Sequence, residues 1–130
     1  MSNGPAIGIG TRAVNSTNTS ITSYTIGISN AVGTVREGYK LFFSNAITTA
    51  GLITRGAHSF VSDPGFVDPR ADDYHLASAS PAIDRGVDAR VYADLDGNPR
   101  PQGAGYDILD SATTLYHSSI GATVDFAHAV

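Results

Sequence analysis

Apolar and polar residues alternate in the first third of the chain. Tyr24, Ile26 and Ile28 fall at every second position of one run, which places them on one face of a strand and the polar residues on the other. Further β-favouring runs lie at 6–10 and 33–43. Asn, Gly and Ser separate these runs, and no long helical pattern lies between them. The pattern therefore predicts an all-β fold of short strands.

Strands of this length, broken at intervals by Asn and Gly, are typical of a stack of coils in which each coil contributes two or three strands. We expect two to three coils within residues 1–61, close to the roughly three repeats that a stable stack needs. Residues 44–61 are predicted to form a loop with a short strand near 52–54. A small antiparallel β-sandwich is the alternative, because short strands with turn signals support either architecture.

Turn residues dominate from residue 62 to residue 107. Five of the six prolines lie there, and the Asp-Pro pairs that begin at Asp63 and Asp68 are turn initiators, because Pro fixes φ and the Asp side chain bonds to the backbone two residues on. The run SPAIDRG predicts one helical turn, with Ser80 as its N-cap, Ile83 as the residue it buries and Gly86 as its left-handed end.

The ordered motifs DPGFVDP, DDYHL, SPAIDRG and DLDGNPRPQGAGYDI in this region resemble the C-terminal module of right-handed parallel β-helix bacterial surface proteins, a pectate-lyase-like group whose members often carry a C-terminal anchor region. GYKLFFSN at 38–45 is similar to the last strand-and-Asn rung before that module. The resemblance implies a short right-handed parallel β-helix over 1–61 and a turn-rich cap over 62–107. It also implies secretion or cell-surface display and association with polysaccharide.

The chain departs from the family pattern after Asp107, where the family continues with Gly-Ala and this chain continues with Ile108. Residues 108–130 are therefore expected to form an extra β segment or tail, with strands at 113–116 and 122–126 that cap the stack or pair with another subunit. The three parts together are expected to make one domain of ordinary size.

Composition narrows the classes of partner. The net charge of -4 and the pI of about 5.3 provide no basic stripe for nucleic acid. The chain has no Cys, so disulfides and thiolate metal sites are excluded. We find neither a signal peptide nor a run of apolar residues long enough for a membrane span. The acidic surplus leaves carboxylates for a cation such as calcium.

The best candidate for a Ca²⁺ site is the loop DLDGN, where Asp94, Asp96 and Asn98 place oxygen ligands at alternate positions around a Gly. The spacing differs from that of the EF-hand loop. The alternative is an ordinary turn before Pro99, in which Asp and Asn side chains cap backbone amides.

A second acidic group could supply paired carboxylates or another cation site, although sequence cannot give the distances that acid–base catalysis requires. Its members are Asp63, Asp68, Asp72 and Asp73. Solvated turn carboxylates are the alternative. Arg100 is a candidate for binding an acidic sugar through bidentate contacts, and a structural pairing with Asp84, Asp94 or Asp107 is the alternative.

The function expected is that of a non-catalytic or accessory end module of an extracellular β-helix protein, which contacts carbohydrate or mediates assembly. A polysaccharide or a small molecule is the expected ligand. An exposed strand edge predicts a homo-oligomer. The alternative is a calcium-dependent hydrolase or polysaccharide lyase that uses the carboxylates within 63–96, so whether the chain is an enzyme stays open. A third possibility is a fragment of a longer protein that folds on dimerisation.

Overall fold

The computed structural model describes residues 2–11, 13–94 and 96–108, and over these residues the protein is all-β. The strands are β1 (Ser2–Ile9), β2 (Ala13–Ser16), β3 (Thr19–Thr22), β4 (Tyr24–Glu37), β5 (Lys40–Phe43), β6 (Ile47–Arg55), β7 (Phe60–Val61), β8 (Phe66–Asp68) and β9 (Asp73–Leu76). A single 3-10 turn, η1 (Pro69–Ala71), joins the last two strands. Within the described residues, no helix has the length and apolar character needed to cross a membrane.

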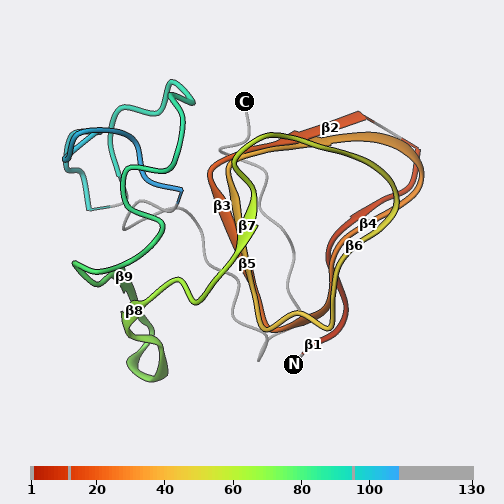
Figure 1. Ribbon diagram of the computed structural model, residues 1–130, viewed down its shortest axis with the longest axis horizontal. Coiled ribbons are helices and arrows are strands. Elements are labelled where there is room, and N and C mark those ends of the chain that lie inside the picture. Colours follow the sequence, from red (N-terminus) through yellow and green to blue (C-terminus); the bar gives the residue numbers. More distant parts are fainter. Residues whose placement is uncertain (1, 12, 95, 109–130) are drawn as a thin grey trace.

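The strands of the first half pair in parallel. β4 lies beside β1, β2 and β6 in one sheet, and β5 lies between β3 and β7 in another. Figure 1 shows the reason: the chain follows nearly the same path three times, so that corresponding strands lie above one another. We call these passages coil 1 (residues 2–11 and 13–22), coil 2 (residues 24–43) and coil 3 (residues 47–61). Parallel pairing throughout this half excludes the antiparallel sandwich.

The register of the sheets gives the length of a coil. Ile7 pairs with Ile28, and Ile28 with Thr49, so each coil takes 21 residues at this column. Thr19 and Lys40, which pair in the other sheet, are also 21 residues apart. The 21-residue repeat that both sheets share between coils 1 and 2 indicates that the whole coil, and not one strand, is the repeating unit. Coil 3 is shorter, since Leu41 pairs with Phe60, 19 residues on.

Apolar side chains that point inward from the coils form the main core. On coil 2, Ile28, Val35 and Phe42 are at most 1% exposed. Of the three residues predicted to share an apolar face, Tyr24 and Ile28 are buried and Ile26 is only partly buried. Each fully buried side chain of this size contributes about 1.5–3 kcal/mol, which is the main stabilisation available to a chain without disulfides.

The turn-rich segment packs against the outer face of the sheet β3-β5-β7, to the left of the coils in Figure 1. Leu41, next to the inward-facing Phe42, points outward and is buried with Ala82 and Ile108. Asn18 fixes the contact, because its Nδ2 donates to the Val87 carbonyl at 2.6 Å and its Oδ1 accepts from the Val87 N–H at 2.9 Å. That this segment closes an end of the stack stays a prediction.

Two local predictions differ from the structure. Residues 44–61 contain the nine-residue strand β6, of which 52–54 were predicted, because the neighbouring β4 pairs with it on both sides of an irregularity between Asn30 and Val35. SPAIDRG forms turns without a helical segment: Ala82 is its fully buried residue, and Asp84, with φ of 54°, adopts the left-handed conformation in place of Gly86. The tail strands predicted at 113–116 and 122–126 lie outside the described residues.

Candidate functional site

The interior of the stack is covered at coil 1 and open at coil 3. One inward-facing column shows this clearly: Ile21 on coil 1 is 4% exposed, Phe42 on coil 2 is 1% exposed, and Val61 on coil 3 is 66% exposed. Ile47, also on coil 3, is an exposed apolar side chain at 48%, although Ile26, its partner on coil 2, is only partly buried. At Val61, coil 3 therefore presents a core position to solvent where a further coil would cover it.

The backbone of coil 3 is open on the same side. Among the described strands, β6 pairs only with β4, and β7 pairs only with β5. Their outer edges thus offer peptide groups that can pair with another chain. We refer to these edges, together with the exposed side chains of Ile47 and Val61, as the coil 3 end.

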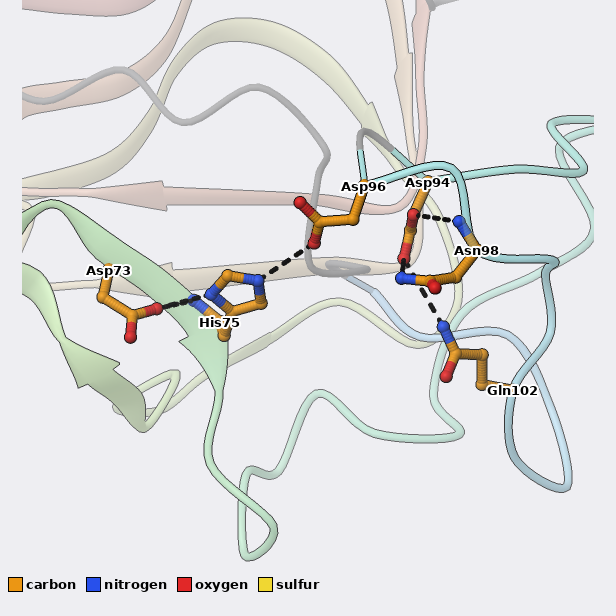
Figure 2. Close-up of polar contacts among 6 residues, drawn as sticks. All are labelled: Asp73, His75, Asp94, Asp96, Asn98 and Gln102. Atoms are coloured by element: carbon orange, nitrogen blue, oxygen red, sulfur yellow. Dashed lines mark hydrogen bonds and ion pairs between the residues drawn. The ribbon is translucent and has the colours of Figure 1, made fainter.

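The predicted calcium loop forms a closed turn, bridged between Ala93 and Pro99. Figure 2 shows that the carboxylate of Asp94 points at Asn98, accepting from its backbone N–H at 2.7 Å and from its side-chain amide at 3.0 Å. Asp96 turns instead toward His75. These contacts are the ones expected if the loop is an ordinary turn before Pro99 and not a calcium site. In the part of the chain that the structure describes, no group of three His, Asp or Glu side chains could hold a metal ion, and calcium binding stays a prediction.

His75 links β9 to this loop (Figure 2). Its Nδ1 lies 2.5 Å from Asp73 Oδ1, and its Nε2 lies 3.0 Å from Asp96 Oδ2. The hydrogen bonds to Asp73 and then to Asp96 raise the pKa of His75 above its ordinary value. The hydrogen bond from His75 lowers the pKa of Asp73. All three side chains are about 40–50% exposed, so the link is a solvated clamp between two turns.

The remaining candidate carboxylates make local contacts. Asp63 accepts from the Gly65 N–H at 2.9 Å, and Asp68 accepts from the Arg70 N–H at 3.2 Å to cap η1. Asp72 accepts from the Tyr74 hydroxyl at 3.4 Å. The contacts of Asp63 and Asp68 to the backbone two residues on have the geometry of a turn, and that of Asp72 joins two side chains.

Arg100, the candidate for an acidic sugar, lies over an aromatic ring. Its guanidinium carbon is 5.8 Å from the centroid of Tyr106, within the range of a cation–π contact. Asp107, one of the partners considered for it, accepts a hydrogen bond from the Asp84 N–H at 2.7 Å.

A buried charged cluster lies at the corner where β4 leads into β5. Lys40, the only lysine in the chain, is fully buried, and its Nζ donates to Ser16 Oγ at 2.6 Å. Glu37 is 3% exposed, accepts from Ser59 Oγ at 2.6 Å and lies 3.6 Å from Arg55 Nε. Burial lowers the pKa of Lys40 to about 7, although the nearby Glu37 carboxylate raises it.

Sequence reasoning missed this cluster, although a signal was present. Lys40 stands two residues before Phe42 in a predicted strand, and alternate residues of a strand share a face. The alternation therefore placed Lys40 inside with Phe42. A charged residue is assigned to the surface by default, because burying an isolated charge is costly.

Comparison of the chain with protein-family models, with curated proteins and with solved structures finds no match. The resemblance of residues 62–107 to the end module of β-helix surface proteins therefore rests on the residues alone and stays a prediction.

Proposed function

We propose that this chain is an assembly module, a short right-handed parallel β-helix whose coil 3 end binds a second copy of the chain. The observation that carries the proposal is the column from Ile21 through Phe42 to Val61, buried on two coils and 66% exposed on the third. The right hand follows from the strong preference of parallel crossover connections for that hand.

A second copy fits this surface for two reasons. The same patch on two molecules can face itself across a two-fold axis, which gives a closed dimer. Strands related by such an axis run antiparallel, so two copies of β6 can exchange backbone hydrogen bonds while Ile47 and Val61 of both copies cover one another. The exposed apolar side chains gain most from being covered, because hydrophobic burial scales with the area removed from water.

The setting proposed for this module is the cell surface or the extracellular space, in a larger β-helix protein associated with polysaccharide. The resemblance of residues 62–107 supports this setting. Every candidate carboxylate makes a contact in a local turn or clamp. We propose an accessory role in preference to a hydrolase or lyase, because these carboxylates already have intramolecular partners.

The test is the mass of the protein in solution by sedimentation equilibrium, over a hundredfold range of concentration. The wild-type chain is expected to associate to a dimer, and Val61→Lys and Ile47→Lys are each expected to weaken the dimer roughly tenfold. That factor corresponds to about 1.4 kcal/mol, a reasonable loss for a half-buried apolar side chain.

Val67→Lys is the matched control, because Val67 is 56% exposed on β8, away from the coil 3 end. It is expected to leave the dimer unchanged. A wild-type chain that stays monomeric at millimolar concentration would contradict the proposal, and so would equal weakening by all three substitutions.

A further inference from the structure

A cavity of about 270 Å³ lies where the corner of the stack meets the turn-rich segment. Asn18 and Val87 hold the two parts together nearby through a pair of hydrogen bonds. The cavity is lined by Tyr39, His58, Phe60, Asp84, Arg85 and Gly86. Its walls thus combine aromatic rings from coils 2 and 3 with a carboxylate and a guanidinium from the turns.

The aromatic wall is made of Tyr39 and His58, whose rings stack at a centroid distance of 4.8 Å and an interplanar angle of 25°. Both residues adopt left-handed backbone conformations, with φ of 52° and 67°, at the corner where coil 1 carries Asn18 with φ of 47°. Asn tolerates this conformation, whereas bulkier side chains are disfavoured there. Strained residues cluster at functional sites, and here two of them build one wall of a cavity.

The polar wall has unused hydrogen-bonding capacity. Arg85 is exposed, and none of the described carboxylates lies within ion-pair distance of its guanidinium. Asp84 accepts from the Gly105 N–H at 2.6 Å through Oδ1, while its Oδ2 receives no hydrogen bond from a described residue. Asp84 also has a left-handed backbone, with φ of 54°. The two side chains therefore offer one cation and one acceptor to a ligand.

We propose that this cavity binds a small six-membered ring compound carrying one carboxylate and at least one hydroxyl group. The ring lies on the Tyr39–His58 stack, as rings do on aromatic side chains. The carboxylate pairs with Arg85, whose planar guanidinium matches it bidentately. The hydroxyl donates to Asp84. The volume is below the range of about 300–1,000 Å³ that accommodates drug-sized ligands, so a single ring is the size expected.

Two kinds of molecule share this chemistry, hydroxylated aromatic acids and sugar acids. The probes are therefore 4-hydroxybenzoate and glucuronate, and benzyl alcohol serves as a ring without the carboxylate. Binding is measured by isothermal titration calorimetry and by chemical-shift changes at Tyr39 and His58. We expect saturable binding of at least one of the two acids, and binding of benzyl alcohol at least tenfold weaker. The acid that binds more tightly shows whether the natural ligand is a hydroxylated aromatic acid or a sugar acid.

Two substitutions test the walls separately. Arg85→Gln removes the cation from an exposed position and is expected to weaken binding roughly tenfold or more. Tyr39→Asn removes the ring and places at this corner the residue that coil 1 carries there, so the variant is expected to fold and to lose binding. Arg90→Gln is the matched control, since Arg90 is exposed and does not line the cavity.

The site goes beyond the proposed assembly function and does not depend on it. Val61→Lys, which weakens the dimer, is expected to bind the acid as the wild-type chain does. Failure of both acids to bind at about 10 mM, roughly tenfold above a weak Kd of about 1 mM, would overturn the site and leave the assembly proposal standing. Binding that is equal in wild type, Arg85→Gln and Tyr39→Asn would also overturn it.

Discussion

At the scale of single residues, the buried Lys40 makes the free energy of unfolding depend on pH. Its pKa in the folded protein is lowered by burial to about 7, whereas in the unfolded chain it is near 10.4. Between these two values the unfolded chain binds a proton that the folded protein does not, so the free energy of unfolding rises with pH. The absence of any other lysine and of Cys leaves few other groups that titrate in this window.

The wild-type free energy of unfolding is therefore expected to increase between pH 7.5 and 9.5, by up to about 1.4 kcal/mol per pH unit. Lys40→Met, of similar length and without a charge, is expected to lack this increase. Urea unfolding at several pH values measures both slopes. The same slope in both proteins would show that Lys40 is not the group responsible.

His75 is a second residue whose titration tests its contacts. Because Asp73 and then Asp96 raise its pKa above 6.5, the clamp stabilises the fold fully below pH 6.5 and is lost as the pH rises through the higher folded value. Because the pKa of Asp73 is lowered, its carboxylate stays charged in mild acid. The clamp is lost when the pH falls through the lowered pKa of Asp73. The clamp is thus strongest in the interval between the two titrations.

NMR titration of the His75 ring is expected to give a pKa above 6.5, and Asp73→Asn and Asp96→Asn are both expected to lower it, Asp73→Asn by more. Asp72→Asn is the control, because Asp72 contacts Tyr74 and does not contact His75. No change on substitution of either partner would mean that the clamp does not form in solution.

At the scale of elements, close stacking of β4 on β6 depends on Gly51. A Cβ at this position would lie 2.0 Å from the carbonyl oxygen of Asn30, and the residue has φ of 88°. Gly51→Ala is therefore expected to destabilise the protein by about 2 kcal/mol or more. Gly10→Ala is the matched control, because no atom lies within 4 Å of its Cβ position. Thermal unfolding compares the two, and equal melting temperatures would contradict the stacked register.

The same element shows what the sequence could predict. The alternation in 19–28 indicated strands correctly, because inward positions of one coil are apolar whatever lies beside them. Of β6, only residues 52–54 were predicted as a strand, because Gly51 interrupts the alternation, and Gly is required there by the backbone of β4, which no local pattern records. The turn at 80–86 differed for a similar reason: contact with Leu41 and Ile108 selects Ala82, and not Ile83, as its buried residue.

At the scale of the whole molecule, the sequence predicted an exposed strand edge but not its place, and the strand pattern left parallel coils and an antiparallel sandwich as alternatives. The turn carboxylates were predicted as ligand or catalytic groups because acidic residues can be identified from sequence alone. In the structure, most of them form hydrogen bonds with residues close to them in the chain. The coil 3 end includes the side chains of Ile47 and Val61, which are ordinary strand residues in the sequence, and the exposure of Val61 follows only from the place where stacking stops. A cavity between segments 39–60 and 84–86 likewise depends on tertiary contact.

Amide hydrogen exchange at low and high protein concentration tests the central claim most directly, because it reports which edge another molecule covers. Protection of the β6 and β7 amides is expected to increase with concentration, while that of β8 and β9 stays constant. Concentration-independent exchange of β6 and β7, in a sample shown to be dimeric, would contradict the claim that the coil 3 end is the surface of assembly.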